Sequence, residues 1–449
     1  MHQAGSAMST QKIAVIGSGI SGLSAAWLLS RRHQVTLYEA GDHLGGHANT
    51  VDVDTPQGPI AVDTGFIVFN ERNYPNLVAL YEHLGVASNE TEMSFALSFN
   101  GGAYEYAGAG LGGFFGQRRN LARPTHWRLL RDISRFFETA QRAVSACAPD
   151  MTLGAFLASE GYSETFVDDH IVPMGAAIWS TSMTEMLAFP ARSFVDFYAN
   201  HGMLQFKDRP NWRTVAGGSR NYVQRLVEDG DFEIQRGNAA KRIVRHPGFV
   251  HVVDGRGAIR PFDQVVMATH ADQALALIEN PDPLEQNLLG AFSYQANRTV
   301  LHRDVRWMPR RKRLWSSWNY LKRDSGAESE LCVTYWMSRL QGLPAHTNLF
   351  VTLNPYDEIH PKTVEREYSY DHPVFDTTAM TAQKDLWALQ GQRRTWFCGS
   401  YFGFGFHEDG IQSGLAVAED LGGLQRPWQV PNASGRIAAQ RPATIEAAE

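Results

Sequence analysis

KIAVIGSGISGLSAAWLLSRRHQVTLYE, residues 12–39, is the stretch that decides the fold. Residues 12–16 form a short apolar run that ends in glycines, as a buried parallel strand does. Residues 23–29 carry apolar side chains at helical spacing, and residues 34–39 have the pattern of a second strand. The stretch therefore predicts a strand, a helix and a second strand in one unit of about 30 residues.

The turn between this strand and helix has the glycine spacing of a dinucleotide site. It reads Gly17-Ser18-Gly19-Ile20-Ser21-Gly22, which fits G-x-G-x-x-G, and Glu39 ends the next strand. The glycines allow a tight turn, close approach of the backbone to a pyrophosphate, and packing of the helix on the strand. The helix N-terminus offers free N–H groups to a diphosphate, and Glu39 can accept hydrogen bonds from a ribose diol. An acid at this position also argues against the 2′-phosphate of NADP.

Two further glycine-rich segments favour FAD over NAD. Gly45-Gly46-His47 follows Glu39-Ala40 closely, so the backbone can approach an extended diphosphate a second time. Near the end of the chain, residues 397–400 have the pattern of a strand end, and residues 410–414 begin a helix rich in small residues. A helix N-terminus directed at the flavin pyrimidine ring would stabilise the negative charge of reduced flavin.

Length, composition and charge set broader limits. At roughly 150 residues per domain, the 449 residues correspond to about three domain-sized units, or to two with insertions. With 43% hydrophobic and 20% charged residues, the chain can bury a core, which excludes disorder, collagen and coiled coil for its bulk. The net charge of -6 gives no global reason to expect a nucleic-acid partner.

Targeting and metal signals are weak. Residues 13–30 contain no charge, but glycines and serines interrupt the run, so we expect neither a signal peptide nor a membrane span. Cys147, Cys332 and Cys398 lack CxxC spacing, which favours a reducing compartment and a cytoplasmic protein. The HEDG segment at residues 407–410 lacks the spacing of HExxH, and we expect no metal.

Over residues 12–421 the chain resembles the flavin-dependent amine oxidase superfamily, which also holds phytoene desaturases and protoporphyrinogen oxidases. The resemblance is carried by residues 15–46, Asp63-Thr64-Gly65 before residues 74–77, residues 263–269 and residues 399–418. Residues 318–320, 334–337, 351–355 and 403–410 are similar to a bacterial subgroup of predicted FAD/NAD-binding, amine-oxidase-like proteins. Relatives of that subgroup typically occur beside, or in plants fused to, cyclopropane fatty acyl synthases, and some are implicated in desaturating methyl-branched acyl chains toward furan fatty acids.

The resemblance implies an α/β fold of the amine oxidase and phytoene desaturase type. A discontinuous, Rossmann-like FAD-binding domain is expected from residues 10–75, 212–285 and 390–425. An α+β substrate domain, with helices over an antiparallel sheet, is expected from residues 76–211 and 286–389. Residues 1–9 and 426–449 are expected to be flexible tails.

The motifs and the resemblance together imply non-covalent FAD, since Cys398 does not align with the family's flavin-linking cysteine. Ala240 to Ile243 aligns with the family's adenine-contacting V-x-x-I. The expected cofactor-binding residues are Gly17, Ser18, Gly19, Ile20, Ser21, Gly22, Glu39, Ala40, Gly45, Gly46, His47, Gly65, Phe66, Ala240, Gly399, Ser400, Gly410 and Ile411.

Three departures from the family weaken amine oxidase chemistry and leave flavin redox chemistry standing. Ser400 follows Gly399 where the family usually has an acidic residue. His407 stands where a tyrosine of the aromatic cage would align on Gly410. Residues 291–302 contain no lysine, whereas amine oxidases use a lysine to hold a water at flavin N5.

These observations favour an FAD-dependent oxidoreductase that desaturates an apolar, lipid-like substrate such as a modified fatty acyl chain. His407 is the expected base, because an imidazole with an ordinary pKa of about 6.5 suits removal of the second hydrogen. The alternative is that His407 only bonds within the turn, with Asp409 as N-cap. Tyr401 and Asn319 are further catalytic candidates, although both also fit packing in a core. An amine oxidase releasing peroxide, a double-bond isomerase and a non-catalytic lipid-handling partner of an acyl-modifying enzyme remain open.

Two basic clusters stand out from the acidic background. Residues 117–144 hold seven arginines against two acids, and residues 302–315 hold six basic residues against one acid. Basic side chains near tryptophan suit peripheral docking at an anionic inner membrane face, or binding to the phosphate of a phospholipid or acyl carrier. A solvated charged face explains the same runs.

Overall fold

The computed structural model describes residues 9–148, 150–179, 181–205, 210–324, 329–344 and 347–439. A five-stranded parallel sheet forms its first layer. In spatial order the strands are β10 (Phe232–Arg236), β2 (Gln34–Glu39), β1 (Lys12–Ile16), β14 (Gln264–Met267) and β20 (Thr395–Phe397). β1 and β2 flank α1 (Ile20–Leu29) in the chain, which confirms the predicted strand–helix–strand unit. Parallel sheets of this kind bind ligands outside the carboxyl ends of their strands.

A seven-stranded sheet forms the second layer. Its order is β19 (Val364–Val374), β15 (Ser293–His302), β18 (Phe350–Leu353), β17 (Ser329–Trp336), β16 (Trp318–Asp324), β7 (Phe95–Phe99) and β8 (Tyr104–Ala107). All neighbours are antiparallel except β16 and β7. The strands of this sheet come from residues 95–107 and residues 293–374. Two strands of the parallel sheet, β10 and β14, lie between these segments in the sequence.

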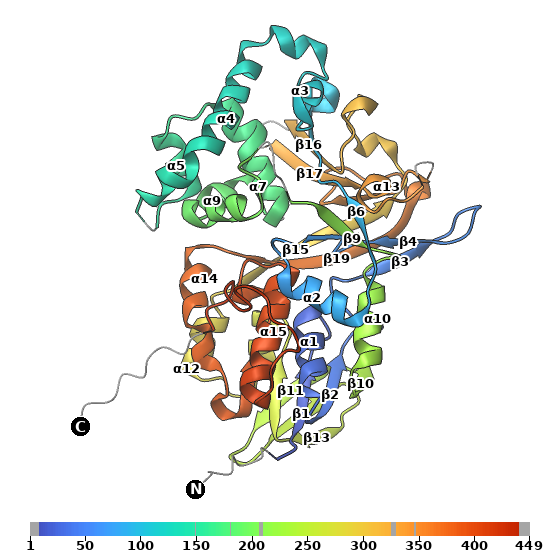
Figure 1. Cartoon of the computed structure of the whole chain (residues 1–449), viewed down its shortest axis with the longest axis vertical. Coiled ribbons are helices and arrows are strands. Elements are labelled where there is room, and N and C mark those ends of the chain that lie inside the picture. The colour runs from blue at the N-terminus through green and yellow to red at the C-terminus, as the bar shows by residue number, and fades with distance from the viewer. Residues whose placement is uncertain are drawn as a thin grey trace.

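Three small sheets extend these layers. β3 (Thr50–Val53) pairs with β4 (Ile60–Asp63), β9 (Trp212–Val215) lies between β5 (Val68–Asn70) and β6 (Ser88–Thr91), and β12 (Val250–Asp254) lies between β11 (Ala240–Arg245) and β13 (Ile259–Phe262). The β5–β9–β6 sheet lies where the chain passes between the two larger sheets (Figure 1).

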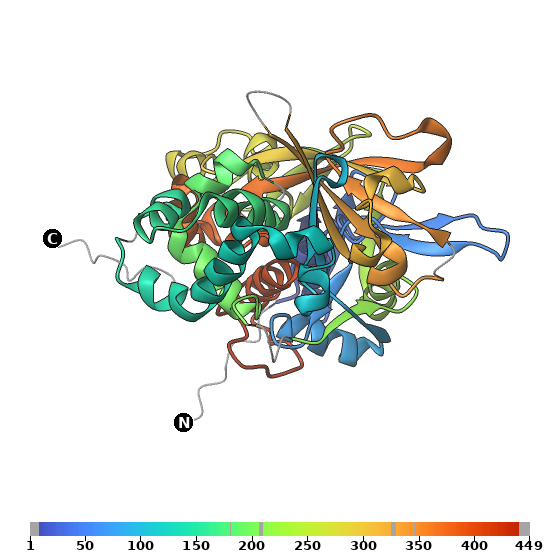
Figure 2. The same ribbon diagram turned by 90° about the horizontal axis from the view of Figure 1, so that it is seen from above.

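A layer of helices packs at the far end of the seven-stranded sheet (Figures 1 and 2). It contains α3 (Gly110–Phe114), α4 (Pro124–Ser145), α5 (Leu153–Ser159), α6 (Glu164–Phe166), α7 (Val172–Trp179), α8 (Met183–Ala188) and α9 (Ala191–Asn200). α4 is amphipathic, because its buried apolar residues recur every three or four positions. These are Leu129, Ile133, Phe136, Ala140 and Val144.

The remaining helices surround the parallel sheet or connect it to its neighbours. They are α2 (Pro75–Leu84), α10 (Arg220–Asp229), α11 (Ala271–Leu277), α12 (Pro283–Leu289), α13 (Met337–Leu340), α14 (Thr377–Ala382) and α15 (His407–Gly422). α15 packs directly on α1 (Figure 1). A Cβ on Gly414 would lie 2.2 Å from the carbonyl oxygen of Ser21, so this approach of the two helices requires glycine.

The segment after α15 is ordered, and the prediction of a flexible tail is wrong for residues 426–439. Arg426 forms an ion pair of 2.7 Å with Glu419, and Arg436 forms one of 2.7 Å with Asp409. Trp428 stacks on Trp27 at 5.7 Å between ring centroids. The sequence lacks periodicity here because single side chains, spaced irregularly, anchor an extended segment. Residues 1–8 and 440–449 lie outside the described residues.

The predicted α/β fold, with a parallel sheet and a separate mixed part, is confirmed. The parallel sheet takes strands from residues 12–39, 232–267 and 395–397, and the seven-stranded sheet from residues 95–107 and 293–374. The domain boundaries given above remain a prediction. No helix in the described part of the chain is both long and apolar enough to cross a bilayer.

Candidate flavin site

The loop between β1 and α1 contains the three glycines of the motif. Two of them, Gly17 and Gly22, lie against neighbouring backbone, and Gly19 faces open space. Gly17 has a φ of +104°, in the left-handed region that favours glycine, and a Cβ there would lie 2.7 Å from the carbonyl oxygen of Ala268. A Cβ on Gly22 would lie 1.9 Å from the carbonyl oxygen of Gly17. A Cβ on Gly19 would meet no atom within 4 Å, so the second glycine faces open space. This is the arrangement that lets a diphosphate reach the N-terminus of α1.

Glu39 lies beside this loop with its carboxylate already oriented. Its Oε2 accepts a hydrogen bond of 3.0 Å from the backbone N–H of Ser18, and its Oε1 accepts one of 2.7 Å from Gly41. Ala40 is exposed next to it. The side chain of Glu39 is only half-buried, so it can also accept hydrogen bonds from a bound ribose.

The second glycine pair lies against the first loop. The backbone N–H of Gly45 donates to the carbonyl oxygen of Ser18 at 3.0 Å. A Cβ on Gly46 would lie 3.2 Å from Cα of Gly19. The structure therefore brings together the two segments that the sequence predicts at the diphosphate.

The N-terminus of α15 lies beside that of α1. A Cβ on Gly410 would lie 2.7 Å from Cγ2 of Ile20, and Ile411 is fully buried. The backbone N–H of Gly399 donates to Oγ of Ser413 at 3.0 Å, which joins the end of β20 to α15. Ser400 follows at the beginning of a short 3₁₀ helix, Ser400–Phe402, and is half-buried.

Gly65 and Ala240 occupy two other sides of the same region. A Cβ on Gly65 would lie 2.2 Å from the carbonyl oxygen of His47, and the backbone N–H of Phe66 donates to that oxygen at 2.7 Å. Ala240 is buried at the beginning of β11, two residues after Asn238, whose N–H donates to the carbonyl oxygen of Glu39 at 2.9 Å. The position of Ala240 next to the end of β2 agrees with an adenine contact.

The residues present fit FAD. Several side chains and glycines of the region keep accessible surface although they lie inside the protein; they are Gly17, Gly19, Gly46, His47, Gly65, Phe66, Phe404, Phe406 and His407. Nε2 of His47 and the hydroxyl of Tyr401 are buried without a hydrogen-bond partner among the described residues. Open space at Gly19, an oriented carboxylate at Glu39 and unused polar atoms are what an extended dinucleotide requires.

His407 begins α15 and is held between two aromatic side chains. Its ring stacks on Phe66 with 3.7 Å between centroids, and its Nε2 lies 3.0 Å from the hydroxyl of Tyr222. Burial lowers the pKa of His407 to about 3, so the expectation of an ordinary value near 6.5 is wrong. Phe406, not Asp409, is the N-cap residue, and Asp409 accepts a hydrogen bond of 2.8 Å from the N–H of Phe406.

The two acids after His407 are structural anchors. Oε1 of Glu408 accepts from the backbone N–H and the side-chain amide of Asn76, at 3.1 and 2.8 Å, and its Oε2 accepts from the N–H of Leu77. It therefore holds the N-terminus of α2 against α15. Asp409 is fully buried and pairs with Arg436. Both anchors fix α15, and hence His407, relative to the rest of the site.

His47, His270 and His372 form a cluster. Of the three, only His47 is predicted as a site residue from the sequence. The ring of His47 lies 5.4 Å from that of His372 and 6.3 Å from that of His270. Burial lowers the pKa of all three histidines, that of His372 to about 4. They are far apart in sequence, on the second glycine loop, after β14 and on β19. No local spacing signals such a cluster, because only the fold brings the three segments together.

The other two catalytic candidates, Asn319 and Tyr401, lie in different surroundings. Oδ1 of Asn319 accepts from the N–H of Ser316 at 2.9 Å, and its Nδ2 donates to the carbonyl oxygens of Ser316 and Thr334. Asn319 is fully buried and its amide holds a turn, so the structure corrects its assignment as catalytic. Tyr401 is also buried, with its ring 5.3 Å from that of Phe292. Its free hydroxyl keeps it as a candidate.

Aromatic side chains extend from His407 toward the helical layer. Phe406 stacks on Phe197 of α9 at 5.1 Å, and Phe404 lies 6.5 Å from the same ring. Phe197 in turn lies 4.6 Å from Trp179 of α7. The helical layer therefore contributes aromatic side chains to the wall beside Phe404 and Phe406.

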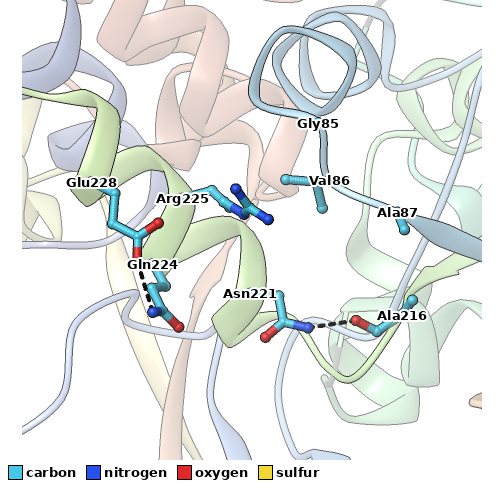
Figure 3. A pocket seen from close by; sticks show the side chains of 8 residues that line it. All are labelled: Gly85, Val86, Ala87, Ala216, Asn221, Gln224, Arg225 and Glu228. Atoms are coloured by element: carbon cyan, nitrogen blue, oxygen red, sulfur yellow. Dashed lines mark hydrogen bonds between the residues drawn. The ribbon is translucent and has the colours of Figure 1, made fainter.

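A surface cleft elsewhere in the molecule offers no comparable chemistry. It has a volume of about 480 Å³ and lies between the end of α2 and α10. Its amides are already used: Asn221 donates to the carbonyl oxygen of Ala216 at 2.6 Å, and Gln224 donates to Glu228 at 2.8 Å (Figure 3). None of the predicted site residues lines it.

Comparison with known proteins decides the family. The family model described as flavin containing amine oxidoreductase matches residues 20–300. The chain belongs to this family. It is therefore an FAD-dependent oxidoreductase, as the sequence predicted, and the glycine loops, Glu39 and the N-terminus of α15 are the residues available to hold the FAD.

Solved structures show the same fold at low sequence identity. Wild-type putrescine oxidase bound to putrescine is 14% identical with a TM-score of 0.64, over 92% of this chain and 99% of that one. The CLA-producing fatty acid isomerase from P. acnes is 16% identical with a TM-score of 0.62, over 92% and 97%. Cyclohexylamine oxidase from Brevibacterium oxydans IH-35A is 16% identical with a TM-score of 0.60, over 92% and 99%. These likenesses establish the amine oxidase type of fold.

Proposed function

We propose that the protein removes a hydride and a proton from an apolar, lipid-like substrate, such as a modified fatty acyl chain, and so forms a carbon–carbon double bond. The observation that carries the proposal is the aromatic, uncharged surrounding of His407. Phe66 stacks on this imidazole, and Phe404, Phe406 and Phe197 continue the wall. Such side chains suit burial of an acyl chain and exclusion of water.

The carboxylates near this wall support an uncharged substrate over an amine. Asp63 accepts hydrogen bonds from the backbone and hydroxyl of Ser219 and from Thr50 and Gln341. Glu408 already accepts hydrogen bonds from Asn76 and Leu77, and Asp409 already pairs with Arg436. Binding an ammonium group in such a place would need a carboxylate that is free to pair with it, because an unpaired buried charge is costly.

Bound FAD supplies the hydride acceptor. The chain's own residues hold the substrate, exclude water and accept the proton. Because burial lowers its pKa to about 3, His407 stays neutral at physiological pH and keeps a ring nitrogen available as a proton acceptor. Tyr222 fixes the orientation of the ring, and burial raises the pKa of its hydroxyl, which therefore stays protonated.

His407→Ala is expected to keep the yellow colour and to slow flavin reduction by substrate about 100-fold or more, the usual contribution of a positioned base. Stopped-flow absorbance under anaerobic conditions measures the rate. Tyr222→Phe is the matched control, since it removes only the hydroxyl at 3.0 Å and should cost less. A His407→Ala enzyme that is reduced at the normal rate removes His407 from the mechanism.

The pH dependence of reduction gives a separate prediction. A base with a pKa of about 3 remains unprotonated as the pH falls from 8 to about 5, so His407 should cause no loss of rate in that range. An unperturbed histidine would lose rate with a midpoint near pH 6.5. Rates measured across this range in wild type and in His407→Ala check the assignment. A wild-type midpoint near 6.5 that disappears in His407→Ala would contradict the lowered pKa.

Two alternatives have specific support. The family name and the putrescine oxidase likeness favour oxidation of an amine with release of peroxide. The likeness to a fatty acid isomerase favours a fatty acyl substrate whose double bond moves without net oxidation. A non-catalytic partner that hands lipid to an acyl-modifying enzyme would show neither reaction.

One set of anaerobic titrations separates these functions. The purified yellow protein is mixed with fatty acids, with phospholipids that carry methyl-branched acyl chains, and with amines, and its visible absorbance is followed. Bleaching by an acyl lipid, with a product two mass units lighter, supports the desaturase. Bleaching by amines alone, with oxygen uptake on aeration, identifies an amine oxidase. An isomerised product of unchanged mass identifies an isomerase, and no turnover of any compound contradicts the enzyme proposals.

A further inference from the structure

Exposed apolar side chains gather at one end of the molecule. Three of the seven large hydrophobic residues that are exposed in the described part of the chain lie within residues 111–127. They are Leu111, Leu121 and Trp127, exposed to 68, 55 and 49%. The indole N–H of Trp127 donates to the carbonyl oxygen of Leu121 at 3.0 Å, which holds the ring on the 3₁₀ helix Arg118–Ala122. Leu111 lies in α3, Trp127 in α4 and Leu121 between them, and the chain passes from α3 to α4 at the top of Figure 1.

The same segment carries cations that have no acidic partner among the described residues. Arg118 and Arg128 are exposed, and no ion pair involves either of them among the described residues. Arg123 lies over the ring of Tyr104 at 5.1 Å, so its charge is not neutralised either. The nearby acid Asp132, in contrast, is buried beside Arg135. The local charge is therefore positive on a chain whose net charge is -6.

The second basic cluster lies against the first. A Cβ on Gly116 would lie 2.3 Å from Cδ2 of Leu314, and the Arg311 guanidinium donates to the carbonyl oxygen of Gly102 at 3.1 Å. Arg310 and Arg313 are exposed beside this contact. The two clusters, separated by almost 200 residues in sequence, therefore form one surface, which we call the α3–α4 basic surface. It consists of Leu111, Arg118, Leu121, Trp127, Arg128, Arg310, Lys312 and Arg313.

A cleft of about 470 Å³ opens at the edge of this surface, beside Arg310 and Lys312. Arg310, Lys312, Trp315 and Met308 are among its lining residues. The ammonium of Lys312 lies 5.9 Å from the centre of the Trp315 ring. Basic groups over an apolar floor match a phosphate headgroup whose glycerol and acyl atoms continue into an apolar phase.

We propose that the α3–α4 basic surface docks the protein onto an anionic lipid bilayer. Charge complementarity selects this partner: the unpaired cations attract anionic headgroups, while leucine and tryptophan side chains enter the interface. The acidic remainder of the chain is repelled, so the protein adopts one orientation on the membrane. In Figure 1, α3 and α4 lie at the end of the molecule opposite β1 and β2. The inference does not depend on the substrate proposed above.

Sedimentation with vesicles tests the proposal on the full-length, FAD-loaded protein. Vesicles of phosphatidylcholine alone are compared with vesicles that contain phosphatidylglycerol, at low and at physiological salt. We expect binding to the anionic vesicles only, weakened by added salt. Arg118→Glu/Arg128→Glu should weaken this binding at least about tenfold, because it replaces two attractions by two repulsions. Leu111→Ser/Leu121→Ser should leave a weaker binding that salt removes completely.

Arg225→Glu/Arg256→Glu is the matched control. Both positions are exposed, Arg225 on α10 and Arg256 in the turn between β12 and β13, and the variant changes the net charge by the same amount. It should bind anionic vesicles like wild type, and the yellow colour reports that every variant is folded. The proposal would be overturned if wild-type protein did not bind vesicles that contain phosphatidylglycerol. It would also be overturned if the Arg118/Arg128 variant and the control lost equal amounts of vesicle binding. Binding to DNA without binding to anionic vesicles would overturn it as well.

Discussion

A Gly19→Val variant is expected to fold normally and to be colourless. The backbone of Gly19 has a φ of -62° and a ψ of 174°, a conformation open to any residue, and a Cβ would meet no protein atom within 4 Å. The valine side chain therefore costs the apoprotein little. It occupies the open space through which a diphosphate would approach the N-terminus of α1, and so blocks FAD. We expect a loss of affinity of at least about 1000-fold, measured by flavin absorbance and fluorescence titration.

Gly248→Val is the matched control for this variant. Gly248 is exposed in the turn between β11 and β12, and a Cβ there also meets nothing within 4 Å. Its FAD content should equal that of wild type. Circular dichroism should show both variants folded. A yellow Gly19→Val protein with normal affinity would contradict the placement of the diphosphate at this loop.

An Arg436→Ala variant is expected to lose about 3–5 kcal/mol of unfolding free energy, as when one partner of a buried ion pair is removed. Asp409 is fully buried, and Arg436 is 2.7 Å from its Oδ1. Chemical denaturation of the FAD-loaded protein measures the loss. Arg220→Ala is the control, because Arg220 and Asp52 form an exposed pair, worth less than about 1 kcal/mol.

The effect of Arg436→Ala should depend on pH in a defined direction. Burial raises the pKa of Asp409 in the folded state above its unfolded value, and Arg436 opposes this shift. An acid with a raised pKa destabilises the fold as the pH rises through that interval. Without Arg436 the loss is therefore largest near neutral pH and shrinks as the carboxyl is protonated at acid pH. In an Asp409→Asn background the loss should be smaller by about 1–3 kcal/mol. Equal losses in both backgrounds would contradict the ion pair.

The cofactor half of the site is readable in the sequence, because its physics is local. Gly17, Gly19 and Gly22 are spaced by the geometry of one turn, and Glu39 ends the strand that this turn feeds. The same holds for Gly410, which begins α15. At Gly17, Gly22 and Gly410 a backbone conformation or a close approach admits few residue types, and at Gly19 the approaching diphosphate does, so the residue type reveals the structure.

The substrate half is not readable in this way. His270 and His372 lie near His47 only because the tertiary fold brings the segment after β14 and the strand β19, which belong to different sheets, beside the second glycine loop. The pKa of His407 depends on burial, which its neighbours in sequence do not indicate. The ordered segment around Arg436 is equally hidden, since it is held by single contacts with distant residues and has no repeating pattern.

The strand order of the parallel sheet also constrains how the protein is made. β14 lies between β1, at residues 12–16, and β20, at residues 395–397. The helix α15 begins only at residue 407. The chain must therefore be synthesised at least to about residue 407 before the cofactor site can be complete. Pairings of such long sequence separation fold slowly and leave sheet edges exposed in the meantime. We therefore expect FAD to bind only after this late segment has been made, and starvation for flavin to leave an incompletely closed chain that proteases and chaperones recognise.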